Sequence, residues 1–179
     1  MTHPVSERPL RPDLPFLLRS PAHFLALGLG SGLLHPAPGT WGTLMGIALY
    51  PLLVMGFMAI PGLNAGFFPA LVLLVCLLAF LLGCRVAQRT GEALGVADHG
   101  SIVIDEIVAI WLVLLAVPQS WTGWLAAFLA FRFFDIVKPW PIRWLDARVK
   151  GGFGVMIDDI VAALFAIACL LLLQQFVPL

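Results

Sequence analysis

Residues 66–84 read GFFPALVLLVCLLAFLLGC, and none of these side chains is charged. A helix of this length, with its rise of about 1.5 Å per residue, matches the hydrocarbon layer of a bilayer, which is about 30 Å thick. Four further apolar runs occupy residues 40–60, 102–117, 121–134 and 155–177. The pattern predicts an all-α, polytopic membrane protein with about five spans, in which the two shorter runs form one helical hairpin that turns at residues 118–120.

The composition of the whole chain agrees with this class. Of its 179 residues, 61% are hydrophobic and 11% are charged, whereas soluble domains have about 45–50% and about 25%. Ten basic and ten acidic side chains balance each other, so the chain has no net positive charge with which to attract nucleic acid. The three cysteines, Cys76, Cys84 and Cys169, lie in apolar runs without metal-ligand spacing, which argues against a disulfide framework or a zinc site.

The charged side chains fall into three segments, residues 7–19, 85–106 and 132–159. With five spans these segments lie on one side of the membrane, and because every Lys and Arg is among them, that side is predicted to be cytoplasmic. Residues 1–21 lack the apolar core of a signal peptide and are predicted to form a cytoplasmic tail, followed by one membrane domain over residues 22–179. The apolar but short segment 21–34 is expected to form an interfacial or re-entrant helix.

Two acidic doublets stand in matching apolar contexts, because residues 103–109 read VIDEIVA and residues 156–162 read MIDDIVA. Both follow glycines, and both are expected to open a long helix, where the positive end of the helix dipole favours carboxylates. Ionisable groups beside a span are costly and indicate a functional site. Oxygen-rich coordination of Mg²⁺, or alternatively Mn²⁺, would be supplied by Asp105, Glu106, Asp158 and Asp159. The competing interpretation is that these acids only provide dipole stabilisation and solubility at helix starts.

A third constellation, FRFFDIVKPWPIR at residues 131–143, surrounds an expected helix end. Pro139 disfavours helical geometry at Lys138, so the helix should stop just before that lysine. Asp135 then lies in the last turn, where the dipole disfavours an anion, and a metal ion, Arg132 or Lys138 must compensate it. The basic residues that follow are more typical of an interfacial belt: Arg143, Arg148 and Lys150.

The loop HPAPGTWGT at residues 35–43 leads into the first full span. Thr40 or Thr43 is expected to cap this helix, and free amides beside Gly39 would let a phosphate approach the backbone. His35 is a candidate acid–base group. An ordinary turn that ends in an N-cap explains the same residues. The glycines of GLGSG lack the strand–helix context of a nucleotide-binding loop and are not assigned to one.

We expect the acids, the cations and the candidate phosphate loop to lie together at one edge of the membrane. This arrangement favours a reaction on a lipid phosphate, because a metal ion beside Lys or Arg is common at sites of phosphoryl transfer. The chain lacks the D-x-D-x-T and C-x₅-R phosphatase motifs and the spaced aspartates of CDP-alcohol phosphotransferases. Two alternatives from other classes are a small cation-binding carrier and a structural membrane subunit whose acids pair with a partner's arginines.

Four blocks resemble the phosphatidylglycerophosphatase A family and occur in its order: PAPGTWGT at residues 36–43, DHGSIVIDEIVA at 98–109, FRFFDIVKPWPI at 131–142 and GGFGVMIDDIVAA at 151–163. The resemblance implies an all-helical, Mg²⁺-dependent enzyme of the bacterial inner membrane. Such an enzyme would convert phosphatidylglycerophosphate in the bilayer to phosphatidylglycerol and phosphate, with its active site on the cytoplasmic face. Thr43, Ala109 and Ala163 replace the serine and the two glycines expected there, and none of them is an expected ligand.

The resemblance also implies a set of site residues. Metal ligands would be Asp105, Glu106, Asp135, Asp158 and Asp159. Groups that bind the substrate phosphate would be Gly39, Thr40 and Lys138. His35 and Arg132 are added to this group by their residue types and positions, and the resemblance does not imply them. In the expected mechanism the metal ions lower the pKa of a bound water, and Glu106 or Asp135 accepts its proton. A rival mechanism makes Asp135 the nucleophile of an aspartyl-phosphate intermediate.

Overall fold

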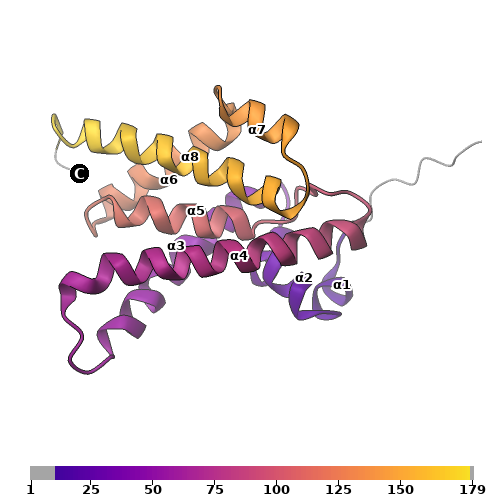
Figure 1. The fold of residues 1–179 in the computed structure, drawn as a ribbon, viewed down its shortest axis with the longest axis horizontal. Helices are drawn as coiled ribbons and strands as arrows, with labels where there is room; N and C mark the ends of the chain where they lie inside the picture. The colour runs from indigo at the N-terminus through magenta and orange to yellow at the C-terminus, as the bar shows by residue number, and fades with distance from the viewer. Residues whose placement is uncertain (1–10, 178–179) are drawn as a thin grey trace, which may run out of the picture.

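The computed structural model describes residues 11–177, and this part of the chain contains helices and loops but no strand (Figure 1). In chain order the elements are α1 (Leu14–Leu18), α2 (Pro21–Ala26), η1 (Gly28–Leu33), α3 (Pro38–Met58), η2 (Ala65–Phe67), α4 (Phe68–Leu94), α5 (Ile104–Leu115), α6 (Trp121–Val137), α7 (Ile142–Arg148) and α8 (Gly151–Leu173). The expected all-α class is confirmed. Residues 1–10 of the predicted N-terminal tail lie outside the described residues.

Within residues 11–177, three segments are long and apolar enough to cross a membrane: α3, η2 with α4, and α8. The helices α4, α5 and α8 run side by side along the long axis of the molecule (Figure 1). The expected hairpin of the two shorter runs is present, because α5 ends at Leu115 and α6 begins at Trp121. However, α5 has 12 residues and α6 has 17, so neither is long enough to be assigned as a span by its length alone.

The short helix α5 is the central element of the bundle. It packs against α3, α4, α6 and α8, and eight of its 12 residues are buried. A helix that is apolar on all sides is typical of a position enclosed by protein. The indole Nε1 of Trp111 ties α5 to α3 by donating a hydrogen bond of 2.8 Å to the carbonyl oxygen of Gly46. Neighbouring helices therefore cover α5, and it does not need the length that contact with lipid would require.

The start of α8 differs from the sequence expectation. The helix begins at Gly151, so Asp158 and Asp159 lie in its third turn and not in its first. The glycines before the doublet allow close packing rather than breaking the helix: a Cβ atom at Gly152 would overlap the carbonyl oxygen of Cys84 on α4. The helix-dipole argument therefore holds for Asp105 and Glu106, which lie in the first turn of α5, but not for the second doublet.

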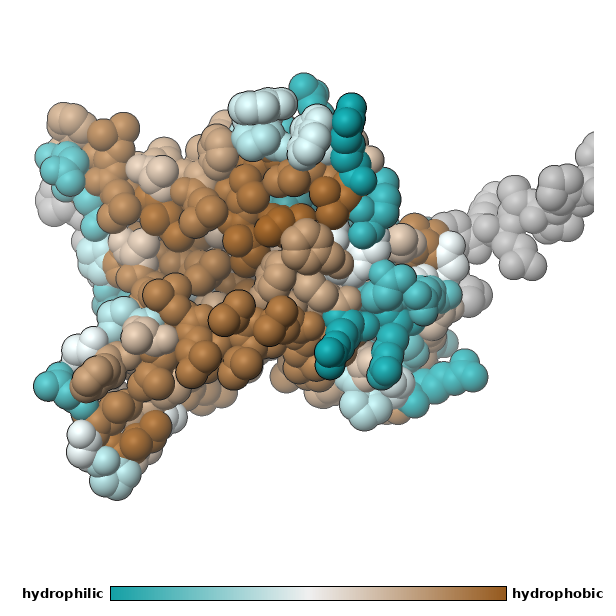
Figure 2. Space-filling view, viewed as in Figure 1, coloured by the Kyte–Doolittle hydropathy of each residue, from teal (hydrophilic) through white to brown (hydrophobic). Residues whose placement is uncertain are grey.

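The charged residues gather at one end of the helical bundle. Hydrophobic side chains cover the middle of the molecule, whereas the largest hydrophilic area lies at the end where α4 finishes and α8 starts (Figure 2). This arrangement agrees with the expectation that the charged segments share one side, because the end of α4, the start of α5 and the end of α6 all lie there.

The predicted short N-terminal helix is divided into α2 and η1, which support the loop in front of α5. The backbone N–H of Val103 donates to the carbonyl oxygen of Ala26 at 2.9 Å. On the other side of α2, the Nδ1 atom of His23 lies 3.0 Å from the Oγ1 atom of Thr90 on α4. Burial lowers the pKa of His23, and the charge of Arg19 lowers it further. This histidine therefore serves as a neutral packing residue between α2 and α4.

Candidate metal and phosphate site

All five acids that the sequence singled out line one cavity of about 100 Å³. They come from the first turn of α5, the last turn of α6 and the third turn of α8. The acids are Asp105, Glu106, Asp135, Asp158 and Asp159. The fold thus brings together side chains that are up to 54 positions apart in the sequence (159 − 105). Lys138 lines the same cavity.

Three of these acids form the tightest group. One carboxylate oxygen from each of Asp105, Glu106 and Asp159 lies within 4.8 Å of the others, and all three residues are buried. One carboxylate oxygen on each of them has no hydrogen-bond partner among the described residues, and the same holds for Oδ1 of Asp158. Buried carboxylates without partners are costly. A divalent cation that prefers oxygen ligands would compensate them, so the residues present fit Mg²⁺ or Mn²⁺.

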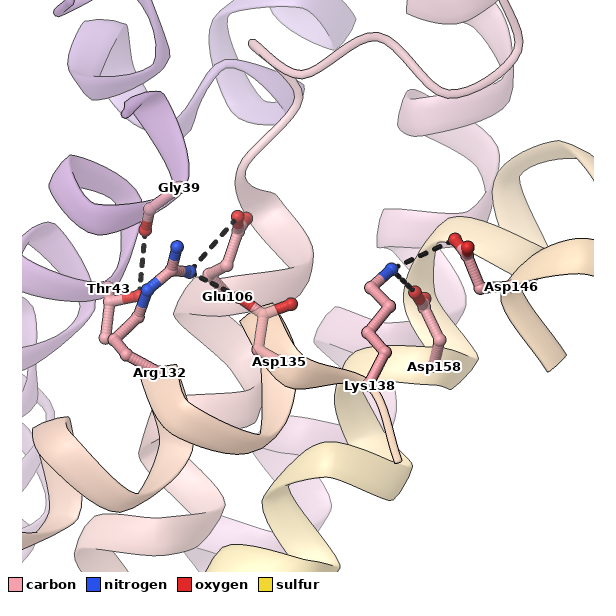
Figure 3. Close-up of polar contacts among 8 residues, drawn as sticks. All are labelled: Gly39, Thr43, Glu106, Arg132, Asp135, Lys138, Asp146 and Asp158. Atoms are coloured by element: carbon pink, nitrogen blue, oxygen red, sulfur yellow. Dashed lines mark hydrogen bonds and ion pairs between the residues drawn. The ribbon is translucent and has the colours of Figure 1, made fainter. Parts of the chain in front are cut away.

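Arg132 compensates the acid at the end of α6. Its Nη1 atom donates to Oδ2 of Asp135 at 2.5 Å and lies 3.8 Å from Oε1 of Glu106 (Figure 3). The sequence left a metal ion, Arg132 or Lys138 as the compensating group for Asp135, and the structure places Arg132 there. This guanidinium therefore connects the three-acid group to the last turn of α6.

Lys138 lies between two other acids. Its Nζ atom donates to Oδ2 of Asp158 at 2.5 Å and to Oδ1 of Asp146 on α7 at 2.9 Å (Figure 3). As expected from Pro139, α6 ends just before Lys138, which has left-handed backbone geometry (φ 44°). Burial alone would lower the pKa of Lys138, but its hydrogen bonds to Asp158 and Asp146 and their negative charges outweigh burial and hold the pKa above its usual value. The ammonium group is therefore charged at neutral pH.

The first turn of α3 also lies beside the cavity, because Gly39 is next to the lining residue Glu106. A Cβ atom at this position would overlap Oε1 of Glu106 and lie 3.1 Å from Nη1 of Arg132. Because Gly39 is the second residue of α3, its N–H has no acceptor within the helix. The expected capping is wrong: the N-cap residue is Ala37, and the Oγ1 atom of Thr43 instead donates to the carbonyl oxygen of Gly39 at 2.8 Å.

Of the predicted phosphate ligands, Lys138 lines the cavity itself, and Gly39 and Arg132 lie next to its lining residue Glu106. His35 and Thr40 are not among the lining residues. His35 is exposed and precedes a cis peptide bond to Pro36. The backbone N–H of Thr40 donates to the carbonyl oxygen of Ala37 at 3.0 Å. The structure therefore gathers Gly39, Arg132 and Lys138 from the predicted phosphate site, and leaves His35 and Thr40 at its margin.

Sequence reasoning missed two acids, Asp98 and Asp146. Asp98 lines the cavity from the loop between α4 and α5, and Asp146 binds Lys138. The signal for Asp146 was its spacing: it lies four residues after Ile142, which is fully buried, and residues i and i+4 share one face of a helix. Asp98 is the first residue of the second of the four sequence blocks, but it lies in a loop without periodicity, and its position did not indicate that it faces the cavity.

The model of the protein family described as phosphatidylglycerophosphatase A matches residues 24–174 of this chain. That range contains every cavity-lining residue and Gly39. The chain belongs to the phosphatidylglycerophosphatase A family. The four sequence blocks contribute Gly39, the acidic doublets, Arg132, Asp135 and Lys138, so residues from all four blocks meet at one site in this member of the phosphatidylglycerophosphatase A family.

Curated relatives support the same assignment. A protein of Haemophilus influenzae named phosphatidylglycerophosphatase A is 48% identical over 160 residues, which cover 89% of this chain and 92% of that protein. A protein of Escherichia coli with the same name is 41% identical over 164 residues, covering 90% and 88%. A Bacteroides thetaiotaomicron protein named putative phosphatidylinositol-3-phosphatase is 39% identical over 149 residues, covering 79% and 86%. No solved structure is significantly similar to this member of the phosphatidylglycerophosphatase A family.

Proposed function

We propose that the protein hydrolyses the terminal phosphate of phosphatidylglycerophosphate in a Mg²⁺-dependent reaction that yields phosphatidylglycerol and phosphate. One observation carries the proposal: Asp105, Glu106 and Asp159 converge with unpartnered buried oxygens beside two cations. Family membership supports the lipid substrate, because two close relatives are named phosphatidylglycerophosphatase A.

Asp105, Glu106 and Asp159 would hold the metal ion, and the free Oδ1 of Asp158 would add a ligand at the side of Lys138. The bound ion would stabilise negative charge on the phosphate oxygens and activate water. Mn²⁺ is the alternative ion for the same oxygen ligands. This assignment leaves Asp135 outside the three-acid group.

Lys138 and Arg132 would neutralise the phosphate oxygens, and the N–H of Gly39 would donate to one of them. Asp135 would accept the proton of the attacking water, because Arg132 fixes only its Oδ2 atom. The new bond joins the water oxygen to phosphorus, and the bond between phosphorus and the glycerol oxygen breaks. That oxygen takes up the proton that Asp135 accepted from the water and leaves as a hydroxyl.

We also propose that α5 and α6 complete a five-span topology with α3, α4 and α8, and that residues 22–179 form one membrane domain. Every described charged residue before position 160 would then lie on the cytoplasmic side of the bacterial inner membrane, as the distribution of Lys and Arg requires. The acidic cavity would open toward lipid headgroups on that side.

The test of function is phosphate release by the purified protein in mixed micelles that contain phosphatidylglycerophosphate. Multiple turnovers of release would support the enzyme. A cation carrier or a structural subunit would release none, and a carrier would instead move the cation across a vesicle membrane. Absence of release by the folded wild-type protein would therefore refute the proposed reaction.

A single-turnover reaction in H₂¹⁸O distinguishes the two routes of attack. If Asp135 only accepts a proton, the label enters the phosphate and the protein stays unlabelled. If Asp135 is the nucleophile, hydrolysis of the aspartyl-phosphate places ¹⁸O in the carboxylate when water attacks at carbon. When water attacks at phosphorus, the label enters the released phosphate, and acid quenching reveals the route by trapping the aspartyl-phosphate itself. Mass spectrometry of the peptide that contains Asp135, with and without acid quenching, reads out both results.

The Gly39→Ala variant is expected to lower kcat/KM about tenfold, because the added methyl group displaces the carboxylate of Glu106 and crowds Arg132. The matched control is Gly56→Ala on the same helix, where a Cβ atom would meet nothing within 4 Å. Equal activity of both variants in the phosphate-release assay would contradict a role for Gly39 at the site.

A further inference from the structure

Asp146 is the one acid around Lys138 that lies on a separate short helix. Its Oδ1 atom accepts a hydrogen bond from Nζ of Lys138 at 2.9 Å, while Oδ2 of Asp158 accepts one from the same ammonium group at 2.5 Å (Figure 3). The side chain of Asp158 is 6% exposed, that of Lys138 is 26% exposed and that of Asp146 is 36% exposed. Asp146 is thus the outer of the two acids that hold Lys138.

The fold of α7 directs Asp146 toward the lysine. Ile142, four residues earlier, is fully buried and anchors this face of α7 against the bundle. At the end of the helix, the Nζ atom of Lys150 donates to the backbone carbonyl oxygen of Asp146 at 3.0 Å, which leaves the carboxylate for Lys138. The turn through Pro139 and Pro141 leads from α6 into α7, which packs against α8, the helix that carries Asp158.

We infer that Asp146 is a positioning residue, which holds the ammonium group of Lys138 at the rim of the cavity so that it can bind a phosphate oxygen. This inference rests on the proposed function. An ammonium group has three N–H donors. Two of them are directed to Asp146 and Asp158, and the third is left for the substrate. Without Asp146, the lysine would bind Asp158 alone and would move toward the carboxylate oxygens of Asp158, which the metal ion would also use.

The Asp146→Asn variant tests the inference by steady-state kinetics. KM for phosphatidylglycerophosphate is expected to rise about tenfold and kcat to fall less than about threefold, because the ammonium group binds the phosphate in both ground and transition states. The Asp146→Glu variant retains the carboxylate at a partly exposed position and should keep KM within about twofold of the wild-type value. The control is Arg148→Gln on the same helix, whose guanidinium lies over the ring of Trp144 at 5.4 Å.

A double-mutant cycle shows whether Asp146 acts through Lys138. In a Lys138→Met background, the Asp146→Asn change should have no further effect on KM, because the group that Asp146 positions is absent. Three results would overturn the inference. The first is an equal rise in KM in both backgrounds, and the second is an unchanged KM in the single variant. The third is a fall in Tm that accounts for the loss of activity. If the wild-type protein itself releases no phosphate, the proposed function fails, and that result is distinct from each of these.

Discussion

The Asp105→Asn and Asp159→Asn variants are each expected to lower kcat/KM for phosphatidylglycerophosphate at least about 100-fold. Each substitution removes one negative charge from the buried three-acid group and replaces an oxygen ligand with an amide. The size of the side chain is nearly unchanged, so the loss of activity would be caused by the lost charge and not by a new cavity. Asp158→Asn is expected to lower kcat/KM by as much, because it also removes a partner of Lys138. Phosphate release at saturating and at limiting substrate concentrations measures kcat and kcat/KM.

Stability is expected to change in the opposite direction. In metal-free detergent, Tm of Asp105→Asn and Asp159→Asn should rise by a few degrees, because each relieves repulsion among buried like charges. The control is Asp13→Asn, since Asp13 is exposed and caps α1, and Asn is an equally good N-cap residue. Loss of activity together with a lower Tm would mean that these acids maintain the fold, and the metal-cluster hypothesis would lose its support.

Removal of divalent cations is expected to abolish phosphate release, and Mg²⁺ should restore it. EDTA would leave Asp105, Glu106 and Asp159 uncompensated in the cavity. Addition of Mg²⁺ to the metal-free protein should also raise Tm, because a ligand that binds only the folded state stabilises it, by about 2.7 kcal/mol at a concentration 100 times its Kd. A thermal-unfolding series across Mg²⁺ concentrations measures this effect without substrate.

The Asp159→Asn variant provides the matching control for the metal experiment. Its Tm should respond to Mg²⁺ far less than that of the wild-type protein, whereas the Asp13→Asn variant should respond normally. Activity that survives exhaustive chelation, or a Tm that Mg²⁺ raises equally in all three proteins, would contradict binding at the three-acid group.

Much of the fold was predictable because the bilayer imposes a simple rule on sequence. The apolar runs mark the helices, and Pro139 marks the end of α6. The start of α8 was not predictable from residue types, because glycines before a doublet fit both a helix break and close helix packing. Only the proximity of Gly152 to Cys84 decides between them. The central position of α5 was likewise not predictable from residue types, since a helix enclosed by protein and a helix that faces lipid are both apolar.

The candidate site was predictable as a set of residues and less so as a geometry. The repeated doublets supply four of the acids that meet in the cavity, and Gly39 from the predicted phosphate loop lies beside one of them, Glu106. The sequence did not indicate that the two members of the second doublet have different partners. Asp159 joins Asp105 and Glu106, whereas Asp158 binds Lys138. Such a division depends on the rotation of α8 about its axis, which only the packing of the bundle determines.

That rotation gives the contact between Gly152 and α4 a role beyond packing. Successive residues of a helix are about 100° apart, so the loss or gain of one residue between Gly152 and Asp158 would turn both aspartates away from their partners at once. The chemistry of the enzyme therefore depends on a count of residues as well as on their identity. The close contact between the backbones of Gly152 and Cys84 fixes the rotation of α8, and with it the direction in which the side chains of its third turn point.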